Sequence, residues 1–447
     1  PLQGRIVQPP LRVDLQPPEE VSHLSTRNVF QTWIQMPLDH FDPQNRDTFL
    51  MRFMFNEEFF GGDGYPVFIL IGGEWDINAG WLRSGNMFEM ARENQGYQIY
   101  TEHRYYGQSL PFSNFTAENL RFLNIDQALA DLAYFIQYLK SQPRFAESKI
   151  IMYGGSYAAN MVLWFKKRYP HLIVGGVASS GPILAQVDFT GYLEVVHEAF
   201  LLEGGQQCIN IINEGIQETI AAIQTEEGRR ALEAAYRYDY SNVIPFLDSL
   251  LNAPTFKATC QTPVGFFLGR TPMEKMGGII AAIQNLGSGS CWTASFQAFL
   301  NSYSRVGNSR AWYYQTCTEY GFFQTAPRSG TVFDSLVWLD VPFYAEVCKQ
   351  AFDERFDEEF VYDAAERVNL IFGGLEPVVN NTINIHGYID PWRALGVYDR
   401  DLQETSPTYN VPRASHCFDM RAWSASDTIR MTQVQQAARR IVARWLL

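Results

Sequence analysis

The sequence has no long apolar run, no cluster of Lys or Arg and no Cys-x-x-Cys pair. Its apolar stretches, such as VFILIGG, are far shorter than the roughly 18 to 20 residues of a membrane helix, so no membrane span is predicted. With a formal charge of −13 and no basic patch, nucleic acid is not an expected partner. The cysteine spacing disfavours a zinc site, and we expect neither a metal nor a cofactor.

Cysteines are few but even in number, which favours disulfides. Two tripeptides, Asn114-Phe-Thr and Asn380-Asn-Thr, match the pattern for glycosylation of Asn114 and Asn380. The chain begins at Pro1 without an initiator Met, which fits the removal of a signal peptide. Together these features predict a secreted or lysosomal protein. The six cysteines are Cys208, Cys260, Cys291, Cys317, Cys348 and Cys417.

The order of apolar segments is typical of an α/β protein. Short apolar strands such as VFILIGG, IIMYGG and VGGVASS alternate with helical patterns, of which residues 124–142 are the clearest, behind a capping Asn124. Strands separated by helices predict a mostly parallel sheet with helices on both faces.

The sequence pattern changes from alternating strands and helices to mainly helical segments, which indicates an insertion. Residues 187–355 show helical patterns and carry most of the cysteines, and we interpret them as an inserted cap domain. After it, RVNLIFGG, TINIHGYIDPW and PTYNVPRASHCFDM are predicted to return to the sheet and its loops. Residues 1–186 and 356–447 then form the catalytic domain, which ends in an amphipathic helix.

The stretch IIMYGGSYAANM predicts a strand, a sharp turn at Ser156 and a helix, the arrangement of a nucleophile elbow. Gly154 satisfies the requirement for a small residue two positions before the serine. Ala158 stands where the pattern has a second glycine, which weakens the motif. The alternative is an ordinary glycine-rich turn between a strand and a helix.

A serine nucleophile needs a general base, and the expected chain order is serine, acid, histidine. Of seven histidines, only His386 and His416 lie in the region that returns to the sheet. His416, in RASHCFDM, follows a strand-like stretch and suits the base. His386 lies at a predicted strand end, where a packed histidine is the better interpretation.

The orienting carboxylate is assigned to Asp390, in the loop HGYIDPW after a predicted strand. Pro391 stiffens this turn, and Trp392 shields it from water. Asp419 lies too close to His416 in sequence to be the first choice, and Asp401 has no strand before it. The residues alone therefore predict a triad of Ser156, Asp390 and His416.

The oxyanion hole requires backbone N–H groups. One is assigned to Tyr157, directly after the nucleophile, and the second to Gly73 in LIGGEWD, where Gly72 adds flexibility. Glu74 is then a candidate partner for the free amine of a substrate. The alternative for Glu74 is an exposed loop acid.

Several stretches together resemble the prolylcarboxypeptidase and dipeptidyl peptidase II-like serine peptidases, over nearly the whole chain. They are PLDHFDPQNRDTFLMRF, ILIGGEW, EHRYYGQSLPF, YGGSYAANMVLWFKKRYPH, QTCTEYGFFQ, IDPWRALG and SHCFDM. The forms SHC and CTEYGFFQ are most similar to the thymus-specific serine protease branch.

The resemblance implies an α/β-hydrolase core with a helical, disulfide-bearing cap that closes over the site and admits chain ends. It implies the same triad and cleavage beside proline. It also implies disulfides Cys208–Cys291 and Cys317–Cys348, and it leaves Cys260 and Cys417 unassigned; paired, they would join the cap to the His416 loop.

Three departures from the family's pattern affect the site. Ala158 and Ala159 replace glycines at the elbow, and His386-Gly387 replaces Asn-Gly before the acid loop. Trp75 replaces glycine in the oxyanion loop, so we count Trp75 and Trp392 with Glu74 as candidate substrate-binding residues.

The expected function is that of a serine exopeptidase acting on peptide substrates. An amino-terminal trimmer needs an anion such as Glu74, and a carboxy-terminal trimmer needs a cation, for which Arg104 is one candidate. An esterase or lipase on the same scaffold, or a noncatalytic binding protein, are the alternatives. The oligomeric state is left open, a homodimer included.

Overall fold

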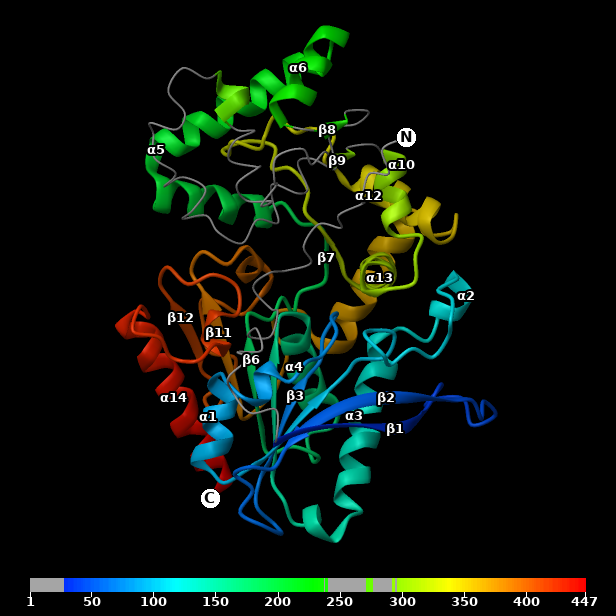
Figure 1. The fold of residues 1–447 in the computed structure, drawn as a ribbon, viewed down its shortest axis with the longest axis vertical. Coiled ribbons are helices and arrows are strands. Elements are labelled where there is room, and N and C mark those ends of the chain that lie inside the picture. Colours follow the sequence, from blue (N-terminus) through cyan, green and yellow to red (C-terminus); the bar gives the residue numbers. More distant parts are fainter. Residues whose placement is uncertain (1–27, 237, 240–270, 276–291, 294–295) are drawn as a thin grey trace. The chain divides into compact units, whose positions relative to one another are not determined.

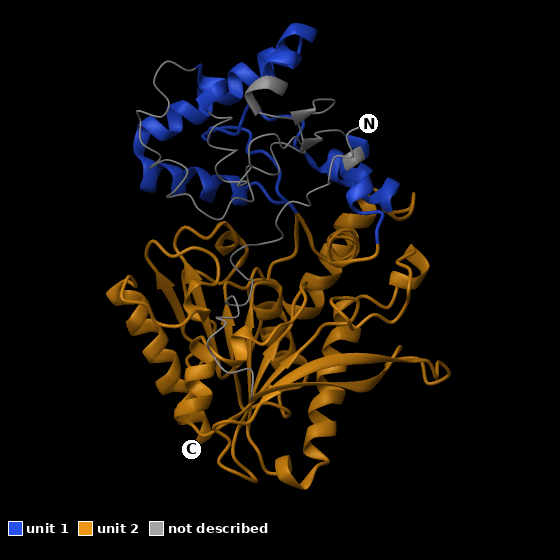
Figure 2. Ribbon diagram, viewed as in Figure 1, with its two compact units in different colours: residues 1–13, 188–305, 323–351 blue, residues 14–187, 306–322, 352–447 orange. Residues whose placement is uncertain are grey.

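The computed structural model describes residues 28–236, 238–239, 271–275, 292–293 and 296–447. The chain divides into two compact units, which Figure 2 colours separately. The larger contains residues 28–187, 306–322 and 352–447, and the smaller contains the described parts of 188–305 and 323–351. Every residue of the predicted triad lies in the larger unit. We describe each unit by itself.

An eight-stranded sheet organises the larger unit (Figure 1), in the order β1-β2-β4-β3-β5-β6-β11-β12. The pairings of β1 with β2 and of β2 with β4 are antiparallel, and all pairings from β4 to β12 are parallel. This is the α/β-hydrolase fold. The strands are β1 Val29–Pro37, β2 Thr48–Asn56, β3 Val67–Ile71, β4 Tyr97–Thr101, β5 Ile150–Gly155, β6 Gly175–Ser179, β11 Thr382–Gly387 and β12 Thr408–Val411.

Helices cover both faces of the sheet (Figure 1). On one face, α1 (Asn86–Glu93) and α14 (Ile429–Leu446) contact each other and share a buried apolar cluster with the strands. On the other, α3 (Ile125–Lys140) packs beside α4 (Tyr157–Arg168), which lies on β5 and β6. The burial of apolar surface on both faces explains why β3, in the middle of the sheet, consists of apolar residues alone.

The helix predicted at residues 124–142 is confirmed as α3. Asn124 is its N-cap and accepts a hydrogen bond from the Gln127 amide. The side chains that face the core are spaced three or four residues apart, as in Ile125, Leu129, Leu132 and Ile136. A polar cap ahead of this apolar stripe fixes both the start of the helix and the face that it buries.

One predicted return to the sheet is wrong: RVNLIF is the second half of a helix, α13 (Glu358–Phe372). Asp357 caps the helix by accepting the Phe360 amide, and Gly373 ends it in the left-handed conformation. The helical period outweighs the strand-like run of apolar residues because only one stripe is buried. That stripe consists of Val361, Ala365, Val368 and Phe372.

The segment 306–322, expected in the insertion, groups with the sheet unit instead. It forms α11 (Asn308–Gln315) and a π-helical turn, Thr316–Tyr320. Glu319 in this turn accepts the Ile125 amide of α3 at 2.8 Å. This buried hydrogen bond connects the segment to the core helix α3. The sequence pattern does not reveal the connection.

The smaller unit is largely helical in its described part. Its long helix α5 (Gly191–Ala222) is broken at Gly205, where φ is 67°. Another helical pattern of the predicted insertion, MEKMGGIIAAIQNLG, lies mostly outside the described residues. Further elements in the described ranges include α2 Ala117–Leu120, β7 Gln186–Asp188, α6 Glu226–Tyr236, β8 Tyr238–Asp239, β9 Trp292–Thr293, α10 Phe296–Ser302, β10 Gly321–Phe323 and α12 Val341–Ala351.

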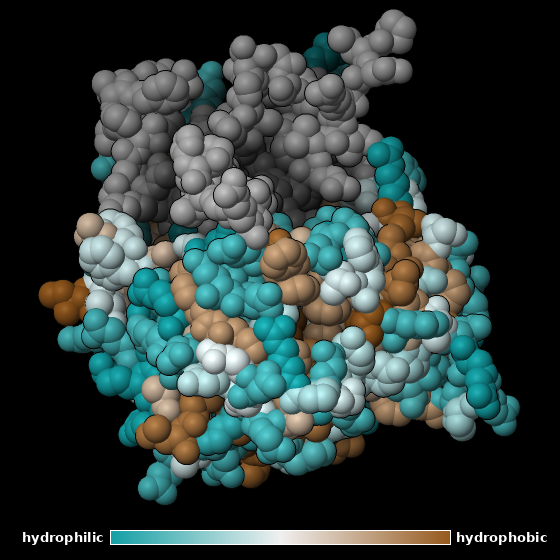
Figure 3. Space-filling view, turned by 60° about the horizontal axis from the view of Figure 1, so that its bottom comes forward, coloured by the Kyte–Doolittle hydropathy of each residue, from teal (hydrophilic) through white to brown (hydrophobic). Residues whose placement is uncertain are grey.

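Some large apolar side chains of the described residues are exposed. On the face drawn in Figure 3, they lie among polar residues. Exposed examples include Trp33 and Leu50 of the first hairpin and Leu370 of α13. Within the described ranges, no helix combines the length and the apolar character of a membrane span.

Candidate active site

Ser156 lies in a sharp turn between β5 and α4. Its φ of 56° and ψ of −129° place a non-glycine residue in a region that costs about 1–3 kcal/mol. The Ser156 amide donates to the Ser179 carbonyl of β6 at 2.9 Å. The predicted elbow is therefore present, held to the neighbouring strand by a backbone hydrogen bond.

Gly154 makes the close contact between strand and helix. A Cβ added there would lie 2.3 Å from the Ala158 carbonyl oxygen. The helix thus approaches the strand through the backbone of Ala158. Ala159, also fully buried, packs in a small apolar cluster with Leu163 and Ala178. The two alanines that replace glycines are accommodated without opening the elbow.

We expect Gly154→Ala to lower kcat about a hundredfold, because the new methyl group pushes helix and strand apart and misplaces the nucleophile. Ala158→Gly is the matched change on the helix side. It should leave kcat within about twofold, because the Ala158 methyl is not the group that meets the strand. Steady-state kinetics of both variants test this pair, and a loss in Ala158→Gly as large as that in Gly154→Ala would contradict the assignment.

The predicted base and acid form a buried pair. His416 Nδ1 lies 2.9 Å from both carboxylate oxygens of Asp390. Asp390 follows β11 and caps the next turn, where it accepts the Trp392 amide at 3.0 Å. Asp390 is fully buried and His416 is 6% exposed, so little solvent screens the pair.

Electrostatics favour the charged form of this pair. Burial opposes ionisation of Asp390, but the neighbouring His416 holds the pKa of this carboxyl below its usual range. Burial likewise acts against the imidazolium, but the Asp390 carboxylate raises the pKa of His416 well above its usual value. A carboxylate at Nδ1 fixes the tautomer and leaves Nε2 for proton transfer. His416 Nε2 is buried and makes no hydrogen bond within the described part of the chain.

The end of β6 brings the serine and the histidine loop together. The Ser179 carbonyl accepts the Ser156 amide at 2.9 Å and the Cys417 thiol at 3.6 Å. The Ser180 hydroxyl accepts the Cys417 amide at 3.0 Å. The Ser179 carbonyl therefore binds both Ser156 and Cys417, which are far apart in sequence. Because His416 directly precedes Cys417, this contact also anchors the loop that carries the histidine.

The oxyanion loop is tightly packed. A Cβ on Gly73 would lie 2.5 Å from the Trp75 ring, and the Trp75 indole donates to the Tyr100 hydroxyl at 2.6 Å. Glu74 is buried rather than an exposed loop acid. Trp75 therefore folds back over the glycine at which the second oxyanion donor is predicted.

Trp392 lies beside the histidine, as its predicted role of shielding requires. Its ring centroid is 6.3 Å from that of His416 and 5.4 Å from that of Phe322. His386 lies packed inside β11, where burial lowers its pKa to about 4. A neutral, buried His386 fits the packed interpretation.

Asp419 is also a buried carboxylate, but its hydrogen-bond partners differ from those of Asp390. It accepts hydrogen bonds from the hydroxyls of Ser179 and Tyr153, and burial raises its pKa to about 6. Asp419 thus connects β5 and β6 through the side chains of Tyr153 and Ser179. No motif in the sequence marks this role, because the partners lie more than 200 residues away.

Arg104 is a structural residue and not a free cation for a substrate. It is fully buried, binds Asp131 through two nitrogens at 2.6 and 2.7 Å, and donates to the carbonyls of Leu38 and Phe122. All of these partners belong to the core. The alternative in which Arg104 holds a substrate carboxylate is therefore wrong.

Arg104→Met should lower the free energy of unfolding by about 3–5 kcal/mol, because it leaves the Asp131 carboxylate buried without its main partner. Denaturant unfolding measures this change. The KM of the folded variant for peptides with a free carboxylate should stay within about twofold, and a large increase in that KM alone would return Arg104 to the substrate site.

Four of the six cysteines lie in the described residues. Cys208, Cys317 and Cys348 are each disulfide-bonded, and Cys417 is a buried free thiol. Cys417 is therefore not joined to Cys260. Cys260 and Cys291 lie outside the described residues, so the pairings Cys208–Cys291 and Cys317–Cys348 stay predictions.

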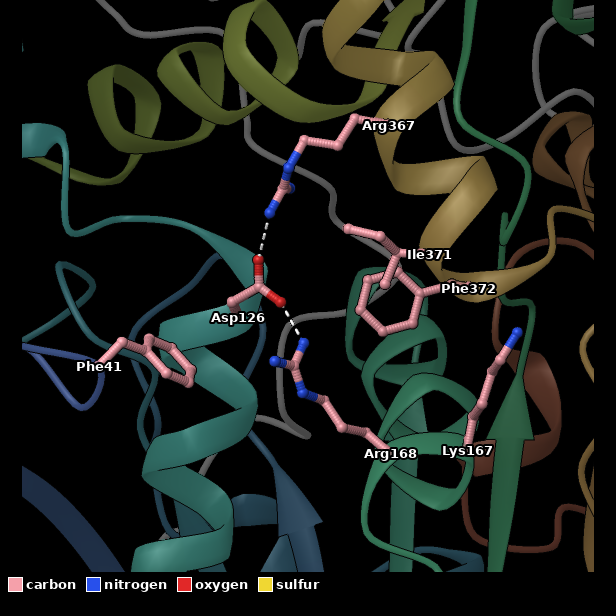
Figure 4. A pocket seen from close by; sticks show the side chains of 7 residues that line it. All are labelled: Phe41, Asp126, Lys167, Arg168, Arg367, Ile371 and Phe372. Atoms are coloured by element: carbon pink, nitrogen blue, oxygen red, sulfur yellow. Dashed lines mark hydrogen bonds and ion pairs between the residues drawn. The ribbon is translucent and has the colours of Figure 1, made fainter.

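A cavity of about 530 Å³ lies at the opposite end of α4 from Ser156 (Figure 4). Asp126 binds both Arg168 and Arg367 there, which ties α3, α4 and α13 together. Because these two guanidinium groups already share one carboxylate, we assign the cavity no ligand. It is lined by Phe41, Asp126, Lys167, Arg168, Arg367, Ile371 and Phe372.

The chain is similar in sequence to several serine peptidases. The chain is 30% identical to the thymus-specific serine protease of Mus musculus over 451 residues, covering 93% of this chain and 87% of that protein. It is 27% identical to the lysosomal Pro-X carboxypeptidase of Bos taurus, with 93% and 87% covered. A "Probable extracellular serine carboxypeptidase" of Arthroderma benhamiae is also 27% identical, with 92% and 67% covered. The model of the family "Serine carboxypeptidase S28" matches residues 36–242 and 273–438, and the chain belongs to this family of serine peptidases.

Proposed function

We propose that the chain is a serine exopeptidase that cleaves next to proline near a peptide terminus, with Ser156, His416 and Asp390 as its triad. The observation that carries the proposal is the buried pair of Asp390 and His416, anchored through Cys417 to the carbonyl that also holds Ser156. The similarity to a Pro-X carboxypeptidase supports the preference for proline.

In the first half of the reaction, His416 Nε2 takes the proton of Ser156, whose Oγ bonds to the scissile carbonyl carbon. The carbonyl electron pair moves onto the oxygen, which the amides of Tyr157 and Gly73 stabilise. The tetrahedral intermediate then collapses, the carbon–nitrogen bond breaks, and the leaving amine takes the proton from His416.

In the second half, water attacks the acyl-enzyme while His416 Nε2 accepts its proton. The oxyanion forms again on the same two amides. Its collapse breaks the bond to Ser156 Oγ, which recovers the proton from His416. The released product carries the new carboxylate, and the enzyme returns to its starting state.

Glu74 is the remaining candidate for recognition of a chain end, and we propose that its carboxylate binds the ammonium group of the substrate. Its burial supports this role, since a buried carboxylate interacts strongly with a cation. The comparison of free and N-acetylated peptides in wild type and Glu74→Gln tests the idea. The KM for free peptides should rise in the variant, and an unchanged KM would remove Glu74 from the site.

Labelling with a fluorophosphonate probe tests the triad directly, because only an activated serine reacts. The native protein should be modified at Ser156, and Ser156→Ala should not. Failure of the folded native protein to react would overturn the peptidase proposal. A panel of short esters and proline amides, together with a mixed peptide library read by mass spectrometry, then separates an esterase from an exopeptidase and identifies the trimmed end.

We also propose that the protein passes through the secretory pathway and carries glycans at Asn114 and Asn380. Both asparagines are exposed, as attachment requires. The disulfide-bonded cysteines support an oxidising compartment. Treatment of the protein from a secreting eukaryotic host with an endoglycosidase should lower its mass, and the double variant Asn114→Gln, Asn380→Gln should abolish the shift.

A further inference from the structure

The side chain of Tyr157 is buried among aromatic rings. Tyr157 is the first residue of α4, directly after Ser156, and it is fully buried. Its ring centroid lies 5.4 to 5.5 Å from the rings of His103, Trp312 and Tyr320. An aromatic ring packed in this way has little freedom to move.

The Tyr157 hydroxyl donates to His103. The Nδ1 of His103 lies 2.7 Å from the Arg104 carbonyl, which accepts only, so this nitrogen carries the proton. Burial lowers the pKa of His103 to about 4, and the ring is neutral at pH 7. Its Nε2 is then an acceptor, 3.1 Å from the Tyr157 hydroxyl. The direction of this hydrogen bond is therefore fixed.

Two further donors complete the coordination of the Tyr157 hydroxyl. Gln315 Nε2 donates to it at 3.0 Å, and the Tyr320 hydroxyl donates at 3.2 Å. The Tyr106 hydroxyl lies 2.6 Å from Gln315 Oε1 and donates to it, which fixes the orientation of the Gln315 amide. The Tyr157 hydroxyl thus uses one donor and both acceptor positions, which defines a single geometry.

This buried network has no part in proton transfer, yet it holds the residue whose amide is the first oxyanion donor. The strained conformation of Ser156 persists only where its surroundings hold it. On the strand side, the hydrogen bond to Ser179 does so. On the helix side, the packed and hydrogen-bonded Tyr157 side chain is the corresponding restraint.

We propose that three side chains act as positioning residues and hold the Tyr157 amide at the oxyanion. They are the side chain of Tyr157 itself, through its hydroxyl group, and the side chains of its partners Gln315 and His103. The inference rests on the proposed peptidase function and extends it to three side chains that touch no substrate. It also gives a role to two segments of the chain, 102–108 and 315–320, that the triad leaves unexplained. Both segments supply partners to one hydroxyl group.

The test is Tyr157→Phe, which keeps the ring and removes the hydroxyl. We expect kcat to fall roughly ten- to a hundredfold, since small misplacements of catalytic groups have effects of this size, with KM within about twofold. A peptidyl aldehyde, which forms an oxyanion when Ser156 adds to it, should bind more weakly by the same factor. A noncovalent peptide product should bind equally well to both proteins.

Tyr105→Phe is the matched control. Tyr105 is also fully buried and donates its hydroxyl to a backbone carbonyl, that of Asn119, outside the network. Its loss should lower thermal stability about as much as Tyr157→Phe does while kcat stays unchanged. Equal losses of kcat in the two variants would reduce Tyr157 to a merely structural residue.

Gln315→Met provides a second test should Tyr157→Phe fail to fold. It removes the donor to Tyr157, and its effect on kcat should not add to that of Tyr157→Phe, because both changes break the same hydrogen bond. Wild-type kcat and aldehyde binding in either folded variant would overturn the inference while leaving the peptidase function intact. Native protein that does not react with the fluorophosphonate probe would overturn both.

Discussion

Ser156→Ala is expected to lower kcat for peptide hydrolysis by about a millionfold, the largest effect that we predict. The methyl group cannot form the acyl-enzyme, so water must attack the scissile bond directly. The oxyanion amides and the bound peptide remain, and they should preserve a residual acceleration of about 10³ to 10⁴ over the reaction in water. Single-turnover kinetics with excess enzyme can measure such slow cleavage.

Adding His416→Ala to Ser156→Ala should change kcat little, because the base has no nucleophile left to activate. Ser148→Ala is the matched control. Ser148 is fully buried just before β5, the strand that ends at the elbow, and its hydroxyl has no hydrogen-bond partner in the part of the chain described. Its removal should leave kcat unchanged. A Ser156→Ala protein with more than a few per cent of native activity would exclude Ser156 as the nucleophile.

The positions of the proposed triad can be read from the sequence because each of its three residues follows a strand end. Ser156 follows β5, Asp390 follows β11, and His416 follows β12, and these three strands belong to the parallel part of the sheet, so their carboxyl ends lie at the same edge. The contact of His416 with Asp390 is confirmed by the structure. Strands and turns can be predicted from short stretches of sequence, so local patterns were enough to select these three positions.

The network around Tyr157 could not be predicted in this way. His103, Tyr157 and Gln315 meet across separations of 54 and 158 residues, and nothing in their local sequence encodes the contact. The same limit hid the role of Asp419 and the grouping of residues 306–322 with the sheet. These features depend on packing between distant segments, whereas periodicity reports only which face of one segment is buried.

The identity of α13 shows how a local pattern can mislead. RVNLIFGG ends in two glycines after an apolar run, as a strand before a loop would. In the structure, Leu370 is 83% exposed while Val368 and Phe372 are buried. An apolar residue on the solvent side of the helix completed the strand-like run. Extending the window back to the Asp357 cap reveals the helical period.

Asp390→Asn is expected to lower kcat about ten-thousandfold while the protein remains folded. An asparagine can present its NH₂ group to His416 Nδ1, which stabilises the wrong tautomer and places the proton on Nε2. The base is then unable to accept the Ser156 proton. Fluorophosphonate labelling should slow by a similar factor. Asp401→Asn is the control. Asp401 has no strand directly before it and accepts the nearby Thr408 amide at 2.6 Å, so the variant should keep native kcat.

The residual activity of Asp390→Asn should also have a different pH dependence. The Asp390 carboxylate raises the pKa of His416, and catalysis requires neutral His416, so native kcat/KM should fall as the pH drops through that raised pKa. Without the carboxylate, only Cys417 still opposes the effect of burial, so the pKa of His416 falls and its neutral form persists to lower pH. The acid limb of kcat/KM must therefore move to lower pH in Asp390→Asn and stay in place in Asp401→Asn. An acid limb at the native position, or at higher pH, would show that another group sets the titration of the base.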